Sequence, residues 1–378
     1  MPQLARTGGM TAATRQPWIH SPRADGLLIL LPPLVATAVA AMVARGSTNN
    51  VPVWAWALLI VGVDVAHVYG TLFRTYLRPS TIRQRPALYA LAPLLGWIAG
   101  VLLYSAGRLA FWRALAYLAT FHFVRQQYGF MRIYARRERT VSNIDRTVDA
   151  AAIYAATLYP LIYWHAHLPR RFQWFVSGDF IALPAVCAPI AGAAFLAILA
   201  AYAAKELRLL FAQRLINVPK NLLLLGTLVS WYVGIVVLNG DLPFTVTNVV
   251  SHGVPYLALV WLLGHDEVLH SGAPSSPRRL GVRAFFTTAG IPLFCLVLIG
   301  LAYIEEGLWD GMVWRDHASL FPLFQTLSVV NDRATLTWLV PLLALPQITH
   351  YVLDGFIWRL HGAGEGSQAV AFTRDVQG

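Results

Sequence analysis

Residues 27–44 read LLILLPPLVATAVAAMVA and contain no charged side chain. A helix crosses the hydrocarbon core of a bilayer in about 20 apolar residues, and blocks of this kind recur along the chain. The strands of a membrane barrel would alternate over about ten residues, and no such alternation is present. The sequence therefore predicts an all-α, polytopic transmembrane helical bundle. The first block is longer than the apolar part of a usual signal peptide, which favours an uncleaved first span.

The overall composition points to the same class. Of the 378 residues, 57% are hydrophobic and 12% are charged, whereas a soluble globular protein is usually about a quarter charged. The two cysteines, Cys187 and Cys295, both fall inside predicted spans. This position disfavours a structural disulfide or a thiolate metal site.

We predict ten membrane spans within a single transmembrane domain at residues 26–360. A basic cytoplasmic segment, 1–25, precedes this domain, and a flexible cytoplasmic tail, 361–378, follows it. The short apolar segment 318–330 is interpreted as re-entrant or as a half-helix. The predicted spans are 26–44, 52–77, 87–107, 111–135, 148–166, 181–204, 221–239, 243–264, 284–304 and 334–358.

The net charge of +11 comes mainly from connecting segments between the spans. Segments 78–86, 136–147, 205–220 and 265–283 are rich in Arg and Lys, whereas 305–317 has one Arg against four acidic residues. Segment 167–180, with two Arg residues, weakens the contrast. The positive-inside rule makes the basic set cytoplasmic and places both termini there. We therefore expect a multi-pass protein of a bacterial inner membrane, whose partner is the lipid bilayer and not nucleic acid.

Four of the eleven histidines lie deep inside predicted spans: His67, His122, His252 and His350. All four are on even-numbered spans, so their helices are predicted to run in the same direction. Each lies about 9–14 residues before the cytoplasmic end of its span, which places the four within roughly 8 Å of one another in depth. Ionisable side chains in a span are costly and usually face the bundle interior.

Four imidazoles at one depth can meet at one point if their helices are neighbours. Neutral imidazole is a common ligand of iron, zinc and copper. The pattern thus predicts a shared metal or cofactor site. Taken singly, each histidine is also compatible with a hydrogen-bonded packing role.

Polar residues accompany each of these histidines one helical turn away. A carboxylate beside an imidazole fixes its tautomer and raises its basicity; alternatively, such pairs satisfy each other and hold helices together. The partners are Asp64 for His67, Gln126 for His122, Asn248 and Tyr256 for His252, and Gln347 and Asp354 for His350.

Two other histidine pairs are weaker candidates. His165 and His167 form a His-x-His motif in a predicted outer loop. His265 and His270 are five residues apart, which puts them on different faces of a helix and unlike a zinc-protease motif.

Two stretches resemble a known family. Residues 345–361, LPQITHYVLDGFIWRLH, resemble the last-span motif of the Brp/Blh-type membrane β-carotene dioxygenases, and residues 251–261, SHGVPYLALVW, are similar to a histidine-bearing span of that family. The segment around Asp64, His67, Tyr69 and Gly70 is similar to its His-Phe-Gly motif. The resemblance implies iron bound by histidines within the spans and cleavage of β-carotene with dioxygen.

The chain also departs from that family. Tyr256 stands where the family has a second histidine, the family's His-Gly-Ala-Leu-Asp motif has no match, and His122 has no counterpart. The resemblance therefore supports iron binding more strongly than it supports a carotenoid substrate.

The leading hypothesis is a membrane-embedded non-haem iron oxygenase or oxidase that acts on an apolar lipid or on an isoprenoid or carotenoid-like substrate. His67, His122, His252 and His350 would bind the metal. Asp64 and Asp354 would orient these ligands or add a fifth, and Gln126 and Tyr256 would orient ligands, oxygen or substrate. The redox partner is unknown.

Two alternatives use the same residues. A haem- or quinone-linked electron carrier would use two histidines as axial haem ligands, although four at one depth fit one haem poorly. A proton-coupled transporter would use the buried His and Asp residues as a relay.

Overall fold

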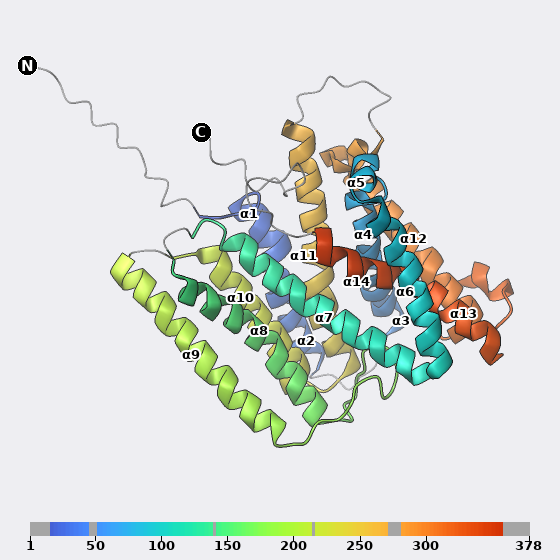
Figure 1. The fold of residues 1–378 in the computed structure, drawn as a ribbon, viewed down its shortest axis with the longest axis horizontal. Helices are drawn as coiled ribbons and strands as arrows, with labels where there is room; N and C mark the ends of the chain where they lie inside the picture. The colour runs from blue at the N-terminus through green and yellow to red at the C-terminus, as the bar shows by residue number, and fades with distance from the viewer. Residues whose placement is uncertain (1–15, 45–50, 139–140, 214–215, 271–280, 358–378) are drawn as a thin grey trace, which may run out of the picture.

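The computed structural model describes residues 16–44, 51–138, 141–213, 216–270 and 281–357. Within these ranges the chain forms helices and no strand (Figure 1). The tail predicted at 361–378 and residues 1–15 of the predicted N-terminal segment lie outside the described residues.

The helical elements include several π-helical and 3-10 segments, which are labelled η. Up to the middle of the chain they are α1 (Pro22–Asp25), η2 (Gly26–Leu30), α2 (Pro32–Val43), α3 (Val53–Trp56), η3 (Ala57–Val65), α4 (Ala66–Arg74), α5 (Pro79–Gln84), α6 (Pro86–Ala106), α7 (Arg108–Tyr134) and α8 (Asn143–Ala166). They continue with α9 (Cys187–Gln213), α10 (Val218–Trp231), η4 (Tyr232–Val237), α11 (Asp241–His270), η6 (Val282–Phe286), η7 (Thr288–Gly290), α12 (Ile291–Trp309), η8 (Asp310–Trp314), η9 (Pro322–Thr326), α13 (Arg333–Leu343) and α14 (Leu345–Ile357).

Among the described residues, seven helical segments are long and apolar enough to cross a membrane. These segments are Pro22–Val43, Val53–Arg74, Pro86–Ala106, Cys187–Ala212, Val218–Val237, Asp241–Leu269 and Thr288–Trp314. The bent pair α13 and α14, whose axes differ by 41°, gives an eighth if the two helices form one span. The integral membrane class is thus supported, whereas ten spans and the orientation of the termini stay predictions. Helices α7 and α8 cover two predicted spans but are not among the seven.

The predicted outer loop at 305–317 is largely helical. α12 continues to Trp309 and the π-helical segment η8 extends it to Trp314. Glu305 and Asp310, which end the apolar run in the sequence, are buried in this helix. Hydrogen bonds from Tyr69 and Gln347 to Glu305 explain how a carboxyl group is accommodated there. The short segment 318–330 contains the 3-10 helix η9.

Helix α11 lies at the centre of the bundle (Figure 1). Its membrane window is 72% buried within the protein, compared with 17% for the peripheral helix α9. α11 contacts η3 and α4, while α14 contacts α4, α6 and α7. The central position of α11 therefore brings helices that are far apart in sequence around one point.

A π-helical segment precedes the first of the candidate histidines. η3 ends at Val65, and α4 begins at Ala66, immediately before His67. π-helical turns within a helix are rare and occur often at functional sites. Because a π-helical turn is wider than an α-helical turn, η3 changes the direction in which the side chains of α4 point around the helix axis.

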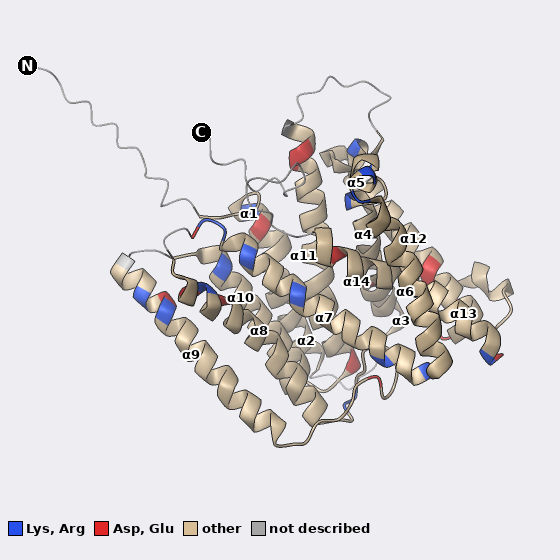
Figure 2. Ribbon diagram, viewed as in Figure 1, with Lys and Arg blue, Asp and Glu red and all other residues tan. Residues whose placement is uncertain are grey.

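Buried ion pairs join α8, α9 and α10 at one end of the bundle, where Figure 2 shows both charge signs close together. Lys220 is fully buried, and its Nζ lies 2.8 Å from Glu138, 3.0 Å from Glu206 and 3.3 Å from Asp149. Lys205 pairs with Asp149 and Glu206. Segment 205–220, predicted as a connection, thus contributes both lysines to helices: α9 continues to Gln213 and α10 begins at Val218.

Candidate metal centre

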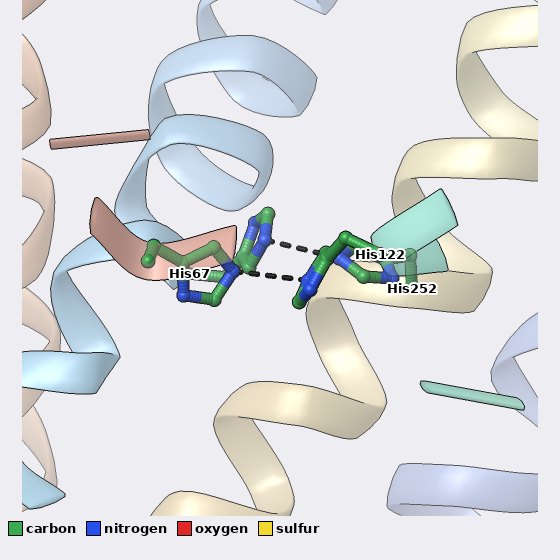
Figure 3. A group of neighbouring side chains, drawn as sticks. His67, His122 and His252 are labelled. Carbon is green, nitrogen blue, oxygen red and sulfur yellow. Dashed lines mark hydrogen bonds between the residues drawn. The ribbon is translucent and has the colours of Figure 1, made fainter. Parts of the chain in front are cut away.

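Four helices bring the four predicted histidines together. His67 comes from α4, His122 from α7, His252 from α11 and His350 from α14, and each side chain is buried. One ring nitrogen from each lies within 4.8 Å of those of the other three. Figure 3 shows the rings of His67, His122 and His252 pointing toward one another from separate helices. These four residues are called the histidine tetrad below.

The spacing within the tetrad suits ligands of a single ion. The Nε2 atoms of His67 and His252 are 3.1 Å apart, as are those of His122 and His350. Two nitrogens bound at about 2.1 Å from one ion lie about 3.0 Å apart at a right angle and about 4.2 Å apart when opposite. The two close pairs match the first separation, whereas the 4.8 Å limit for the whole group exceeds the second, so the tetrad would contract slightly to surround an ion.

Aromatic side chains hold the imidazole rings in place. Phe123 stacks on His252 with ring centroids 3.5 Å apart and planes 8° apart. The ring of Tyr351 packs against His122 at 5.0 Å. Within the tetrad, His67 meets His252 edge to face, at 4.6 Å. These contacts restrict ring rotation, and they surround the nitrogen atoms with apolar material.

Asp354 connects to the tetrad through two hydroxyl groups. Its Oδ1 accepts a hydrogen bond of 2.9 Å from Tyr256, whose hydroxyl lies 2.9 Å from Thr71 Oγ1. Thr71 Oγ1 in turn lies 2.6 Å from His350 Nδ1. The carboxylate is 3.7 Å from His350 Nδ1 and 3.9 Å from His122 Nε2, beyond hydrogen-bond distance. Asp354 therefore acts on His350 through Tyr256 and Thr71.

The other carboxylate, Asp64, lies at the edge of the tetrad. Its Oδ1 is 3.8 Å from His67 Nδ1, which is again longer than a hydrogen bond, and 33% of its side-chain surface is accessible. The group of side chains with metal-ligand spacing consists of the four histidines, and it includes neither Asp64 nor Asp354. Asp64 and Asp354 are thus neighbours of the tetrad.

Three predicted one-turn partners have other roles. Gln126 donates a hydrogen bond of 2.9 Å to the main-chain oxygen of His252, on a different helix from His122. Asn248 donates to the main-chain oxygen of Phe244. Gln347 donates to Glu305. The residues lie near the tetrad as expected, but neighbouring helices and the backbone supply their partners.

The sequence interpretation missed Thr71 and Glu305. Thr71 lies four residues after His67, so it shares the face of α4 that carries this histidine, and this spacing was a usable signal. Glu305 follows an apolar run, and the sequence therefore predicts a loop position for it. Its contacts with Tyr69 and Gln347 arise from the packing of helices that are distant in sequence.

The His-x-His motif of His165 and His167 does not form a second cluster. His165 Nδ1 bonds to the main-chain oxygen of Leu161 and its Nε2 to the hydroxyl of Tyr117. His167 Nδ1 bonds to the main-chain oxygen of Tyr163. In the described part of the chain, the tetrad is the one group of at least three His, Cys, Asp or Glu side chains with metal-ligand spacing.

Gly253 allows α11 to approach η3 closely beside the tetrad. A Cβ at this position would lie 2.7 Å from Val63 Cγ1 and 3.6 Å from His67 Nδ1. We expect Gly253→Ala to lower the free energy of unfolding by about 1–3 kcal/mol, because the helices must separate to admit the methyl group. Gly300→Ala is the matched control, since nothing lies within 4 Å of a Cβ there. Equal stability of the two variants in a denaturant titration would contradict this close packing.

Comparison with known proteins adds no relative from which a function could be transferred. The chain matches no protein-family model, no curated protein and no solved structure.

Proposed function

We propose that the protein is a membrane-embedded metalloenzyme, a non-haem iron oxygenase or oxidase that acts on an apolar lipid or isoprenoid-like substrate. The observation that carries this proposal is the tetrad, in which four buried imidazoles from four helices present nitrogens within 4.8 Å. Iron in such a site would supply dioxygen activation. The protein would supply an apolar surround that excludes water.

A metal accounts for the facing nitrogen atoms better than a purely hydrogen-bonded cluster does. In each Nε2 pair, one imidazole must carry a proton on Nε2 and the other must not. A cation bound by the four facing lone pairs would remove this requirement, because every imidazole could then carry its proton on Nδ1.

The choice of iron and of an apolar substrate rests on further arguments. Imidazole also suits zinc and copper, and the resemblance of residues 251–261 and 345–361 to motifs of the Brp/Blh-type dioxygenases favours iron. Two of the four contributing helices, α4 and α11, belong to segments that are long and apolar enough to cross a membrane, and α14 belongs to the bent pair that could form another span. A substrate dissolved in the bilayer would therefore have a short route to the tetrad.

The two alternatives predict different contents of the site. A haem would have to place its ring where the second pair of imidazoles lies, so convergence of all four disfavours it. A proton-coupled transporter is favoured by one observation: Asp64 is partly accessible while the adjacent His67 is buried.

The test is elemental analysis, absorbance spectroscopy and oxygen uptake on detergent-purified protein. We expect about one iron per chain, no Soret band, and oxygen uptake that keeps pace with loss of an added carotenoid or other isoprenoid. A Soret band would establish the haem alternative. Absence of metal after reconstitution with iron, zinc and copper, together with substrate flux into proteoliposomes, would establish the transporter.

A further inference from the structure

We propose that Thr71 and Tyr256 are positioning residues that hold the proton of His350 on Nδ1 and so keep its Nε2 lone pair directed into the tetrad. The hydrogen-bond arrangement follows from the structure alone; its consequence for metal binding rests on the function proposed above. The four groups involved, Asp354, Tyr256, Thr71 and His350, are all buried.

The direction of each hydrogen bond follows from counting protons. With Asp354 ionised, its Oδ1 can only accept, so Tyr256 donates its single hydroxyl proton to it. The contact of 2.9 Å between Tyr256 and Thr71 then requires Thr71 to be the donor. Thr71 has no second proton, so in the contact of 2.6 Å with His350 its oxygen must accept. The donor there is Nδ1–H of His350.

The opposite tautomer would leave oxygens facing each other. If His350 Nδ1 lacked a proton, Thr71 would have to donate to it, and the oxygens of Thr71 and Tyr256 would meet at 2.9 Å with no proton between them. In a buried site this arrangement loses one hydrogen bond and adds repulsion between lone pairs. The chain from Asp354 therefore selects a single tautomer of His350.

The selected tautomer is the one that a metal requires. A neutral imidazole with its proton on Nδ1 has its free lone pair on Nε2, and Nε2 of His350 is the atom that faces His122. The Nδ1 atoms of His67 and His252, in contrast, have no hydrogen-bond partner. His350 is thus a histidine of the tetrad whose Nδ1 has a side-chain hydrogen-bond partner.

The first measurement uses metal-free protein with ¹⁵N-labelled histidine. The ¹⁵N resonances distinguish protonated from unprotonated ring nitrogens, and loss of signals in His350→Ala assigns those of His350. We expect a protonated Nδ1 in the wild type and a mixture of tautomers in Thr71→Val and Tyr256→Phe. Thr71→Ser, which retains the hydroxyl group, should restore the wild-type spectrum.

The second measurement is Fe²⁺ affinity, determined without oxygen by competition with a chelator. Removing a group that orients a ligating histidine typically costs 10- to 100-fold in metal affinity, and we expect a loss of this size in Thr71→Val. Thr75→Val is the matched control, because Thr75 is a buried threonine directly after the end of α4 and its hydroxyl donates a hydrogen bond to the main-chain oxygen of Thr71. This control should bind Fe²⁺ as the wild type does.

The two measurements separate the two proposals. A wild-type spectrum with His350 protonated on Nε2, or an unchanged tautomer in Thr71→Val, would overturn the positioning role even if iron binds. If Thr71→Val bound Fe²⁺ with the same affinity as the wild type, the proposed consequence for metal binding would also be overturned. A protonated Nδ1 that depends on Thr71, in a protein that binds no metal, would support the hydrogen-bond chain and contradict the metalloenzyme.

Discussion

Simultaneous replacement of His67 and His252 by alanine is expected to reduce bound metal from about one ion per chain to less than a tenth. The two residues supply one of the close Nε2 pairs of the tetrad, at 3.1 Å. Removing both leaves two imidazoles and a cavity, which cannot satisfy a cation in a buried site. The measurement is elemental analysis of the purified variant, combined with oxygen uptake in the presence of substrate.

The matched control for this variant is His165→Ala. His165 is also largely buried, but its ring nitrogens bond to Leu161 and Tyr117 and it lies outside the tetrad. We expect this control to keep its metal and its oxygen uptake. If the double variant retained the metal content and activity of the wild type, the tetrad would have a packing role and the proposed function would be wrong.

A large loss of stability is expected for Lys220→Met. The variant removes the cation that lies within 3.3 Å of Glu138, Asp149 and Glu206, three carboxylates at the junction of α8, α9 and α10. Breaking a buried ion pair by removing one partner costs about 3–5 kcal/mol, because the remaining charge stays buried. Lys205 already forms ion pairs with Asp149 and Glu206, so it does not replace the lost charge of Lys220. The free energy of unfolding, measured by titration with a denaturing detergent, tests this value.

Arg208→Met provides the comparison at an exposed position. Arg208 pairs with Asp145, but 54% of its side chain is exposed, and the Asp145 carboxylate keeps hydrogen bonds from the main-chain N–H and the hydroxyl of Ser142. Exposed pairs contribute about 0–1 kcal/mol, so this variant should unfold close to the wild type. Equal destabilisation of the two variants would mean that the burial of Lys220 does not determine its contribution to the free energy of unfolding.

The helical class and the convergence of the histidines could be predicted from the sequence because each depends on a simple constraint. Apolar blocks of span length have few alternatives to helix in a bilayer, where backbone groups must be paired internally. The similar depth of His67, His122, His252 and His350 followed from their positions within those blocks. Burial of polar side chains then favoured a common interior position.

The hydrogen-bond partners could not be predicted in the same way. Spacing along one helix identifies neighbours on that helix, but Gln126 bonds to the backbone at His252 and Glu305 bonds to Tyr69 and Gln347. These contacts depend on how helices rotate and pack against each other. The π-helical turn in η3 changes that rotation for α4, and no local sequence pattern reveals it.

The distribution of the tetrad along the chain has a consequence for biosynthesis. Its members come from α4, α7, α11 and α14, and the last of these supplies His350. During translation, His350 is the last of the four histidines to be made. The complete tetrad can therefore form only after α14 has joined α4, α7 and α11, and a product terminated before His350 would lack one of its four imidazoles.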